Sequence, residues 1–327
     1  MLTALSVLLS WFTRFPGISK QAFSQLLYML HNIILPSGNL LPASYDAAYA
    51  VIKPYLISVK EYHCCPNDCI LYRGPNADKT SCPICGEDRY VNGGCVPKKR
   101  FKYIPLASRM KRYFETATTS RLLQGHSASI TSTTTEIHDI HHTKTWKKWY
   151  SPGGLFGGDV RGLSLGLCLD GTNPYAKEKN SYSMWPMLVS ILNLPPLLRR
   201  STEFLQLVGI IPGKQEPKNT NTYLQVLVDE LKELNGTQIY DGHQKNWFNV
   251  QAELLLHVMD YPGQNKVFHM YGKLKIYRNT TLNIALCDCI LNFKQFCCRC
   301  WSVFWMLLLY NKGRVLLISQ KDGLPTT

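Results

Sequence analysis

Leu163-Ser-Leu-Gly-Leu-Cys-Leu-Asp170 is an apolar run that ends in a carboxylate. Its length and its apolar, partly branched side chains predict a buried β-strand. Two more strands are expected downstream, at Met184–Leu194 and Phe204–Ile211, and prolines follow each of them in the sequence. These three segments indicate that a sheet forms the centre of this part of the chain.

A helix and a fourth strand follow the three strands. The helix is expected at Tyr223–Leu234, and its apolar stripe comprises Leu224, Leu227, Val228, Leu231 and Leu234. The fourth strand, Ala252–Met259, runs up to Asp260. Three strands, a helix and a strand are the opening order of an RNase H-like core, in which the first and fourth strands are neighbours. The sequence therefore predicts an α/β (α+β) fold in which Asp170 and Asp260 meet.

Paired carboxylates on adjacent strands suit a metal-dependent phosphoryl-transfer site. Magnesium prefers oxygen ligands, and two bound ions stabilise both the attacking and the leaving oxygen of an in-line displacement. Asp170 and Asp260 are therefore candidate catalytic residues and magnesium ligands. The alternative is that these acids only mark turns, because strands often end in aspartate there.

A second cluster of candidate ligands precedes this region. It reads His63-Cys64-Cys65-Pro-Asn-Asp-Cys69, followed by Cys82-Pro-Ile-Cys85-Gly86. Two tight cysteine pairs separated by turn residues predict a closed, structural zinc site with the ligands Cys65, Cys69, Cys82 and Cys85. His63 and Cys64 are the substitutes if one pair is shifted. The alternative is a set of scattered buried thiols. The chain has 12 cysteines, and their grouping in a long chain lacks the pattern of a disulfide framework and favours reduced, metal-binding use.

The chain is basic, with 36 Lys and Arg against 22 Asp and Glu and a net charge of +14. This excess favours a polyanionic partner. The segment Val91–Arg121 contains a single acid, Glu115, and an amphipathic helix is expected over residues 103–123. The expected DNA contacts are Lys98, Lys99, Arg100, Lys102, Arg109, Lys111 and Arg112. A solvated helix face is the alternative, and Lys98-Lys99-Arg100 also fits a short nuclear import signal.

Composition divides the chain into five segments. Residues 1–55 are expected to be helical, with Ser19 and Ser44 as helix caps and Met1–Phe15 as a core helix rather than a signal peptide. Residues 56–125 carry the zinc module and the basic helix, residues 126–145 form a linker, and residues 146–272 hold the partial RNase H-like domain. Residues 273–327 form a divergent, poorly ordered tail whose apolar run is interrupted by Lys294 and Arg299, so no membrane span is expected.

Several blocks of this sequence resemble CACTA (En/Spm)-type DNA transposases, in the same order along the chain. They are the cysteine segment Tyr62–Tyr90, Leu167-Cys-Leu-Asp-Gly-Thr-Asn-Pro174, Tyr182-Ser-Met-Trp-Pro186, Asn193-Leu-Pro-Pro196, Tyr223–Leu231 and Met259-Asp-Tyr-Pro-Gly263. The resemblance implies a nuclear enzyme that cuts transposon ends and joins them to target DNA through an RNase H-like Asp-Asp-Glu metal site. Asp170 corresponds to the first acid and Asp260 to the second.

The resemblance fades after about Gly272, and no residue matches the third acid, a glutamate. We therefore expect a truncated copy of a CACTA-type transposase that binds transposon ends but is inactive alone. A second reading is a non-catalytic, zinc-dependent DNA-binding regulator that competes with intact transposase or associates with it. A third is the product of a pseudogene without function.

Overall fold

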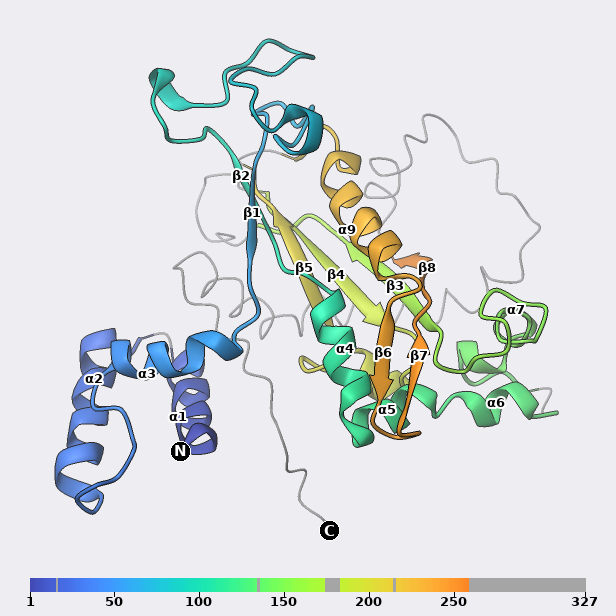
Figure 1. Ribbon diagram of the computed structural model, residues 1–327. Helices are drawn as coiled ribbons and strands as arrows, with labels where there is room; N and C mark the ends of the chain where they lie inside the picture. The colour runs from blue at the N-terminus through green and yellow to red at the C-terminus, as the bar shows by residue number, and fades with distance from the viewer. Residues whose placement is uncertain (16, 134–135, 174–182, 214–215, 259–327) are drawn as a thin grey trace. The chain divides into compact units, whose positions relative to one another are not determined.

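The computed structural model describes residues 1–15, 17–133, 136–173, 183–213 and 216–258 (Figure 1). The chain divides into two compact units, and the boundary between them falls after Ser58. Within the described part of the chain, no helix has the length and apolarity that crossing a bilayer requires.

The first unit, residues 1–58, is helical, as the sequence predicts. It contains α1 (Leu2–Arg14), α2 (Lys20–Met29), the π-turn η1 (Leu30–Ile34), α3 (Tyr45–Ile52) and the short 3₁₀ helix η2 (Lys53–Tyr55). Both predicted caps are present, because the Ser19 hydroxyl accepts from Ala22 N (3.0 Å) and the Ser44 hydroxyl from Ala47 N (3.2 Å). The core of this unit is built from Leu5, Leu9, Phe12, Phe23, Leu27, Tyr45, Ala48 and Ile52.

The second unit, whose described residues lie between 59 and 258, is organised around a six-stranded sheet with the order β1-β2-β5-β4-β3-β8 (Figure 1). The strands are β1 (Lys60–His63), β2 (Arg100–Tyr103), β3 (Leu163–Leu169), β4 (Trp185–Ile191), β5 (Gln206–Ile211) and β8 (Ala252–Val258). Every neighbouring pair is antiparallel except β3 and β8, which run parallel. The predicted strands therefore exist, and the first and fourth lie side by side.

β1 and β2 extend this sheet from the cysteine-containing loops. Lys102 and Tyr103 of β2 pair with Ile210 and Gly209 of β5, and Phe101 and Tyr103 are buried in the same core as β3 and β4. The sequence analysis assigns residues 56–125 and 146–272 to different domains. The structure instead joins segments of both in one sheet.

Helix α9 (Asn221–Leu234) packs against the core of the second unit. Its buried side chains are Tyr223, Val226, Leu227, Leu231 and Leu234, so the apolar face is rotated from the predicted stripe, and Leu224 and Val228 lie at its partly exposed edge. This unit also contains η3 (Gly74–Asn76), η4 (Val91–Gly93), α8 (Pro196–Arg199) and the two-stranded hairpin of β6 (Gln238–Asp241) and β7 (Asn246–Asn249).

The helix predicted over residues 103–123 is wrong in its extent. Tyr103 belongs to β2, and two helices follow, α4 (Ala107–Glu115) and α5 (Ala117–Gln124), with Thr116 in an extended conformation between them. The tip of the β6–β7 hairpin reaches this break, because Gly242 N donates to the carbonyl of Phe114 at 2.8 Å. A contact from more than 100 residues away thus accompanies the break.

The segment expected to be a linker, residues 126–145, contains regular structure in its described part. Helix α6 (Ser127–Thr131), the 3₁₀ turn η5 (Ile140–His142) and the start of α7 (Lys144–Trp149) lie in it. His126 and His141 are buried there, and Trp146 of α7 is fully buried, so side chains of this segment belong to the interior.

Candidate metal centre and catalytic edge

Cys65 and Cys69 lie in a tight turn that follows β1. The backbone N–H of Asp68 donates to the carbonyl of Cys65, and that of Cys65 donates to the carbonyl of Ile70, each at 3.0 Å. The N–H of Asn67 points at Cys65 Sγ from 3.4 Å. Asp68 itself has φ of 61°, in the left-handed region that this sharp turn requires.

Cys82 and Cys85 lie in a second turn of similar form. Gly86 N donates to the carbonyl of Cys82 at 2.9 Å, and Cys82 N donates to the carbonyl of Glu87 at 2.8 Å. Gly86 has φ of 76°, which explains why glycine follows the second cysteine. Each turn therefore directs two thiols toward one point.

The structure brings together all four thiols that the sequence predicts as ligands. Their Sγ atoms lie within 4.8 Å of one another, and Cys65 Sγ and Cys85 Sγ are 3.5 Å apart. A tetrahedral zinc ion with Zn–S bonds of about 2.3 Å separates its sulfurs by about 3.8 Å. The donor set and its spacing therefore fit a metal ion such as zinc. In the described part of the chain, this is the one group of three or more Cys, His, Asp or Glu side chains with such geometry.

The local hydrogen bonds already favour a thiolate at one of these positions. The Asn67 side-chain amide, 3.5 Å from Cys85 Sγ, and the backbone N–H of Glu87 lower the pKa of Cys85 to about 6. Burial raises the pKa of Cys65 and of Cys69. A bound cation would have to offset that cost to keep the cluster deprotonated.

The two substitutes named from the sequence lie outside this cluster. Cys64 is fully buried, with its Sγ 3.5 Å from the carbonyl of Tyr62 and its pKa raised by burial. His63 Nδ1 accepts a hydrogen bond from Arg89 Nε at 3.0 Å. Neither side chain is part of the group that could hold the ion.

Asp170 stands at the end of β3, and its side chain is exposed. The next residue, Gly171, passes close to the indole of Trp185, where an added Cβ would lie 3.0 Å from the ring atoms. Thr172 then pairs with Met184. Gly171 thus allows the backbone to pass Trp185 directly after the acid. Asp260, the second predicted acid, lies outside the described residues.

Most of the basic residues predicted to contact DNA form ion pairs with acidic residues of the same chain. Lys98 pairs with Glu87 (3.2 Å), Arg100 with Glu61 (3.4 Å) and Lys111 with Glu115 (3.9 Å). Their side chains remain about a third to half exposed. Lys102 and Arg112 are half-buried. Such surface pairs are weak and leave the cations accessible to phosphate.

Two predicted DNA contacts need correction. Arg109 is 7% exposed, and its guanidinium donates to the carbonyls of Ile104 and Pro105 and to Gln206 Oε1. Lys99 pairs with the buried carboxylate of Asp68. Both side chains are therefore used inside the fold, because unpaired polar groups there would have to be desolvated without compensation.

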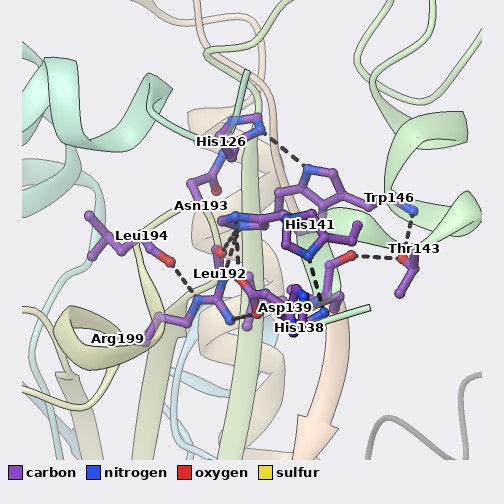
Figure 2. Close-up of polar contacts among 12 residues, drawn as sticks. His126, His138, Asp139, His141, Thr143, Trp146, Leu192, Asn193, Leu194 and Arg199 are labelled. Carbon is purple, nitrogen blue, oxygen red and sulfur yellow. Dashed lines mark hydrogen bonds and ion pairs between the residues drawn. The ribbon is translucent and has the colours of Figure 1, made fainter. Parts of the chain in front are cut away.

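A buried polar cluster that the sequence analysis does not identify connects the 126–150 segment to the loop after β4 (Figure 2). Arg199 donates through both terminal nitrogens to Asp139 (2.7 and 2.5 Å), and Asp139 Oδ2 lies 3.2 Å from His141 Nδ1. Asn193 binds His126 (3.0 Å), Tyr150 (2.9 Å) and the N–H of Ser164 (2.9 Å). Asp170 lies six residue steps beyond Ser164, about 20 Å along the strand, so this cluster is remote from the acid.

Comparison with protein families identifies the chain as a transposase. Residues 136–304 match the family described as Transposase family tnp2, and this match covers more than half of the chain. The chain therefore belongs to the tnp2 transposase family. No curated protein matches it. The family match also continues past Gly272, where the sequence analysis ends the resemblance, into residues that lie outside the described structure.

Proposed function

We propose that the chain is a CACTA-type DNA transposase whose strand-transfer site includes Asp170 and Asp260. Membership of the tnp2 family supports the transposase assignment. The CACTA assignment is supported by the ordered sequence blocks, two of which contain these acids.

The observation that carries the catalytic proposal is the parallel register of β3 and β8. Cys168 is the Cα partner of Val258. Asp170 follows Cys168 by two residues, and Asp260 follows Val258 by the same number. Parallel neighbours end at the same edge of a sheet. The antiparallel run β5-β4-β3 with β8 added in parallel is also the strand order expected of an RNase H-like core.

In this proposal the two carboxylates hold Mg²⁺, which stabilises charge on the attacking and leaving oxygens of the DNA phosphodiester. Asp170 is exposed, so phosphate oxygens can reach it. The resemblance supplies no counterpart of the family's third acid up to about Gly272, where it fades. Two acids hold the ions weakly and position them poorly, so this chain by itself transfers strands inefficiently.

DNA binding is assigned to the accessible part of the basic segment: Lys98, Arg100, Lys102, Lys111 and Arg112. The net charge of +14 supports a polyanionic partner, and the site of action is then the nucleus. The four cysteines hold a structural zinc ion, because they form a closed set of thiols with no position for substrate.

A second candidate function is a non-catalytic regulator that occupies transposon ends or joins intact transposase. The observation that favours it is that the cysteine cluster and the accessible cations lie in the described part of the chain, and a regulator of this kind needs no catalytic site.

Cleavage and retention assays with the full-length chain separate these functions. The substrate is a supercoiled plasmid carrying the terminal repeats of the element that encodes the chain, assayed with and without Mg²⁺. For the transposase we expect specific retention on this DNA and weak Mg²⁺-dependent nicking that Asp170→Ala abolishes. Retention with nicking no greater than that of Asp170→Ala would favour the regulator. Exposed Asp78→Ala is the matched control. Robust nicking that only Asp170→Ala abolishes would show that the chain is active alone, and absence of retention would overturn both functions.

A further inference from the structure

Asp68 is a buried acid that lies between two of the metal-site cysteines. Its residue is 3% exposed, and its carboxylate binds the ammonium group of Lys99 and the hydroxyl of Tyr223. Its second oxygen accepts from the backbone N–H of Lys218 at 3.0 Å. A buried carboxylate is tolerated only with such partners, because removing it from water without them is very costly.

Apart from Lys99, the partners of Asp68 belong to the segment that begins helix α9. Beyond the carboxylate contacts, the Thr222 hydroxyl donates to the carbonyl of Asp68 at 2.9 Å, and Lys218 Nζ donates to Asn67 Oδ1 at 2.7 Å. The first cysteine turn is therefore fastened to the start of α9 by side-chain and backbone contacts. Arg73 and Asp229 form a further ion pair at 2.5 Å between the module and the helix.

These contacts also hold the backbone of the cysteine turn in an unusual conformation. Asp68 has a positive φ of 61°, which costs free energy for any residue other than glycine. Cys65 and Cys69 flank it at three residues and one residue. Because Asp68 is fixed at both its carboxylate and its carbonyl, the directions of the two neighbouring thiols depend on the contacts it makes to α9.

Helix α9 in turn binds the rest of the sheet. Glu230 accepts hydrogen bonds from the Tyr103 hydroxyl on β2 and from the backbone N–H groups of Leu106 and Ala107 (each 3.0 Å). At the far end of the helix, Asn235 Oδ1 accepts from Ala252 N at 2.6 Å, at the first residue of β8. The helix thus links the cysteine turn to β8, the strand that precedes Asp260 in the sequence.

We propose that Asp68 is a positioning residue that couples occupancy of the four-cysteine metal site to the folding of α9 and of the sheet it covers. The proposal rests on the metal site assigned above and adds a thermodynamic consequence. If the contacts of Asp68 favour the ligand geometry, metal binding must stabilise those same contacts by an equal free energy. The metal is then a folding cofactor of the proposed catalytic domain.

Zinc affinity of the full-length protein, measured by competition with a chelator, tests the first half of this coupling. Asp68→Asn keeps the size of the side chain and a residue type that accepts positive φ, but removes the charge. Because this change loosens the turn that carries two of the ligands, we expect zinc affinity to fall by about tenfold, the lower end of the range for residues that orient metal ligands. Asp78→Asn, the same change at an exposed position in the same module, should leave the affinity unchanged.

Hydrogen exchange tests the second half. Removing zinc from the wild-type chain should accelerate amide exchange in residues 221–234 and leave the helices of the first unit, which has its own core, unaffected. In Asp68→Asn, the difference in α9 exchange between zinc-loaded and zinc-free protein should shrink.

Different results overturn different statements. Wild-type protein that binds no zinc would remove both the metal site and the coupling. Wild-type protein that binds zinc tightly, with equal affinity in Asp68→Asn and no change in α9 exchange, would overturn the coupling alone. Should Asp68→Asn fail to fold, Tyr223→Phe removes only the hydroxyl that binds Asp68 and keeps the ring in the core. It should weaken zinc binding less than the loss expected of Asp68→Asn, and unchanged affinity in it would also count against the coupling.

Discussion

Arg109 keeps its guanidinium inside the second unit, where burial lowers its pKa to about 10. Its donors reach two carbonyls of the segment before α4 and the side chain of Gln206 in β5. Arg109 thereby connects a helix to the central sheet. The basic residues of the segment Val91–Arg121 therefore fall into two groups: Arg109 stabilises the interior, and others such as Lys111 are exposed to solvent.

This division predicts opposite effects for two neighbouring substitutions. Arg109→Met should lower the free energy of unfolding by about 1.5–3 kcal/mol, because hydrogen bonds to a charged group are lost and the buried Gln206 Oε1 is left without its donor. Lys111→Met, at an exposed position, should leave stability unchanged and weaken DNA binding. Urea denaturation and DNA titration of both variants measure this. If Arg109→Met reduced DNA affinity without destabilising the fold, the buried role would be wrong.

His126 and His141 predict a pH dependence of stability. Burial lowers the pKa of each to about 4, from an ordinary value near 6.5. The geometry agrees, since Trp146 Nε1 donates to His126 Nδ1 (3.3 Å) and the Arg199 cation lies 2.9 Å from His141 Nε2. An added proton at His126 Nδ1 would meet the Trp146 donor. His141 Nε2 also faces the carbonyl of Leu192 at 2.7 Å, so burial and the Arg199 cation are what disfavour its charged form. Asp139 is the acid that faces the pair, and it also binds Arg199.

Because the unfolded chain binds more protons than the folded one between these pKa values, stability is fully present above pH 6.5 and is lost as the pH falls toward 4. For the pair we expect a loss of about 2–4 kcal/mol between pH 7 and pH 5. Urea denaturation across this range measures it. His141→Asn should show a shallower dependence, whereas exposed His138→Gln should match the wild type. A flat profile in the wild type would contradict the prediction.

At this scale, local chemistry is predictable and distant partners are not. The clustering of the four cysteines is predicted from the sequence, because each of the two turns that carry them is completed within a few residues. Asp68 and Arg109 take partners more than 90 residues away, Tyr223 and Gln206, so their roles are invisible in the local pattern. The cluster around His141 leaves only a weak signal, the histidine-rich run His138-Asp-Ile-His141-His142.

Among the elements, β2 shows how the cysteine loops are joined to the sheet. Phe101 and Tyr103 point into the core, and the alternation in Arg100-Phe-Lys-Tyr103 is a strand signal that a helical reading of the basic segment overlooks. The helix caps Ser19 and Ser44 and the five central elements follow from sequence, because caps and apolar runs act locally. The break at Thr116 does not, since its contact comes from the hairpin tip at Gly242.

The junction of β2 and β5 depends on Gly209. A Cβ at this position would lie 2.7 Å from the ring of Phe101, which is fully buried and cannot move aside. Gly209→Ala should therefore destabilise the second unit by about 1–3 kcal/mol, the usual range for overpacking. Gly153→Ala, where the added methyl group meets open space, is the control for loss of glycine flexibility. Thermal denaturation of both variants decides the matter, and equal stability of Gly209→Ala and wild type would show that Phe101 can yield.

For the whole molecule, the net charge of +14 is a sum over the entire chain. The basic segment Val91–Arg121 and Asp170 are separate stretches of the second unit. The strands that precede the two predicted acids are recognisable in the sequence, because apolar runs mark β3 and β8, and Asp260 itself lies outside the described residues. The ends of β3 and β8 lie side by side because these two strands pair in parallel, and no local sequence pattern specifies this pairing. The exposure of each cation also depends on tertiary structure. The sequence therefore predicts DNA contacts at Arg109 and Lys99, whereas both side chains have partners inside the fold.

The accessible part of the basic segment, which includes Lys98 and Arg112, predicts the salt dependence of DNA binding. Each phosphate neutralised contributes a slope of about −0.9 to log affinity against log salt. Lys98→Gln and Arg112→Gln together should therefore flatten the slope by nearly 2 and weaken binding to specific and unrelated DNA alike. Lys53→Gln in the first unit removes an exposed charge elsewhere and is the matched control. Titrations at several salt concentrations measure the slopes. Affinity that does not respond to ionic strength would mean that these cations are solvated side chains without phosphate contacts. An equal effect of Lys53→Gln would mean that net charge, rather than this segment, attracts DNA.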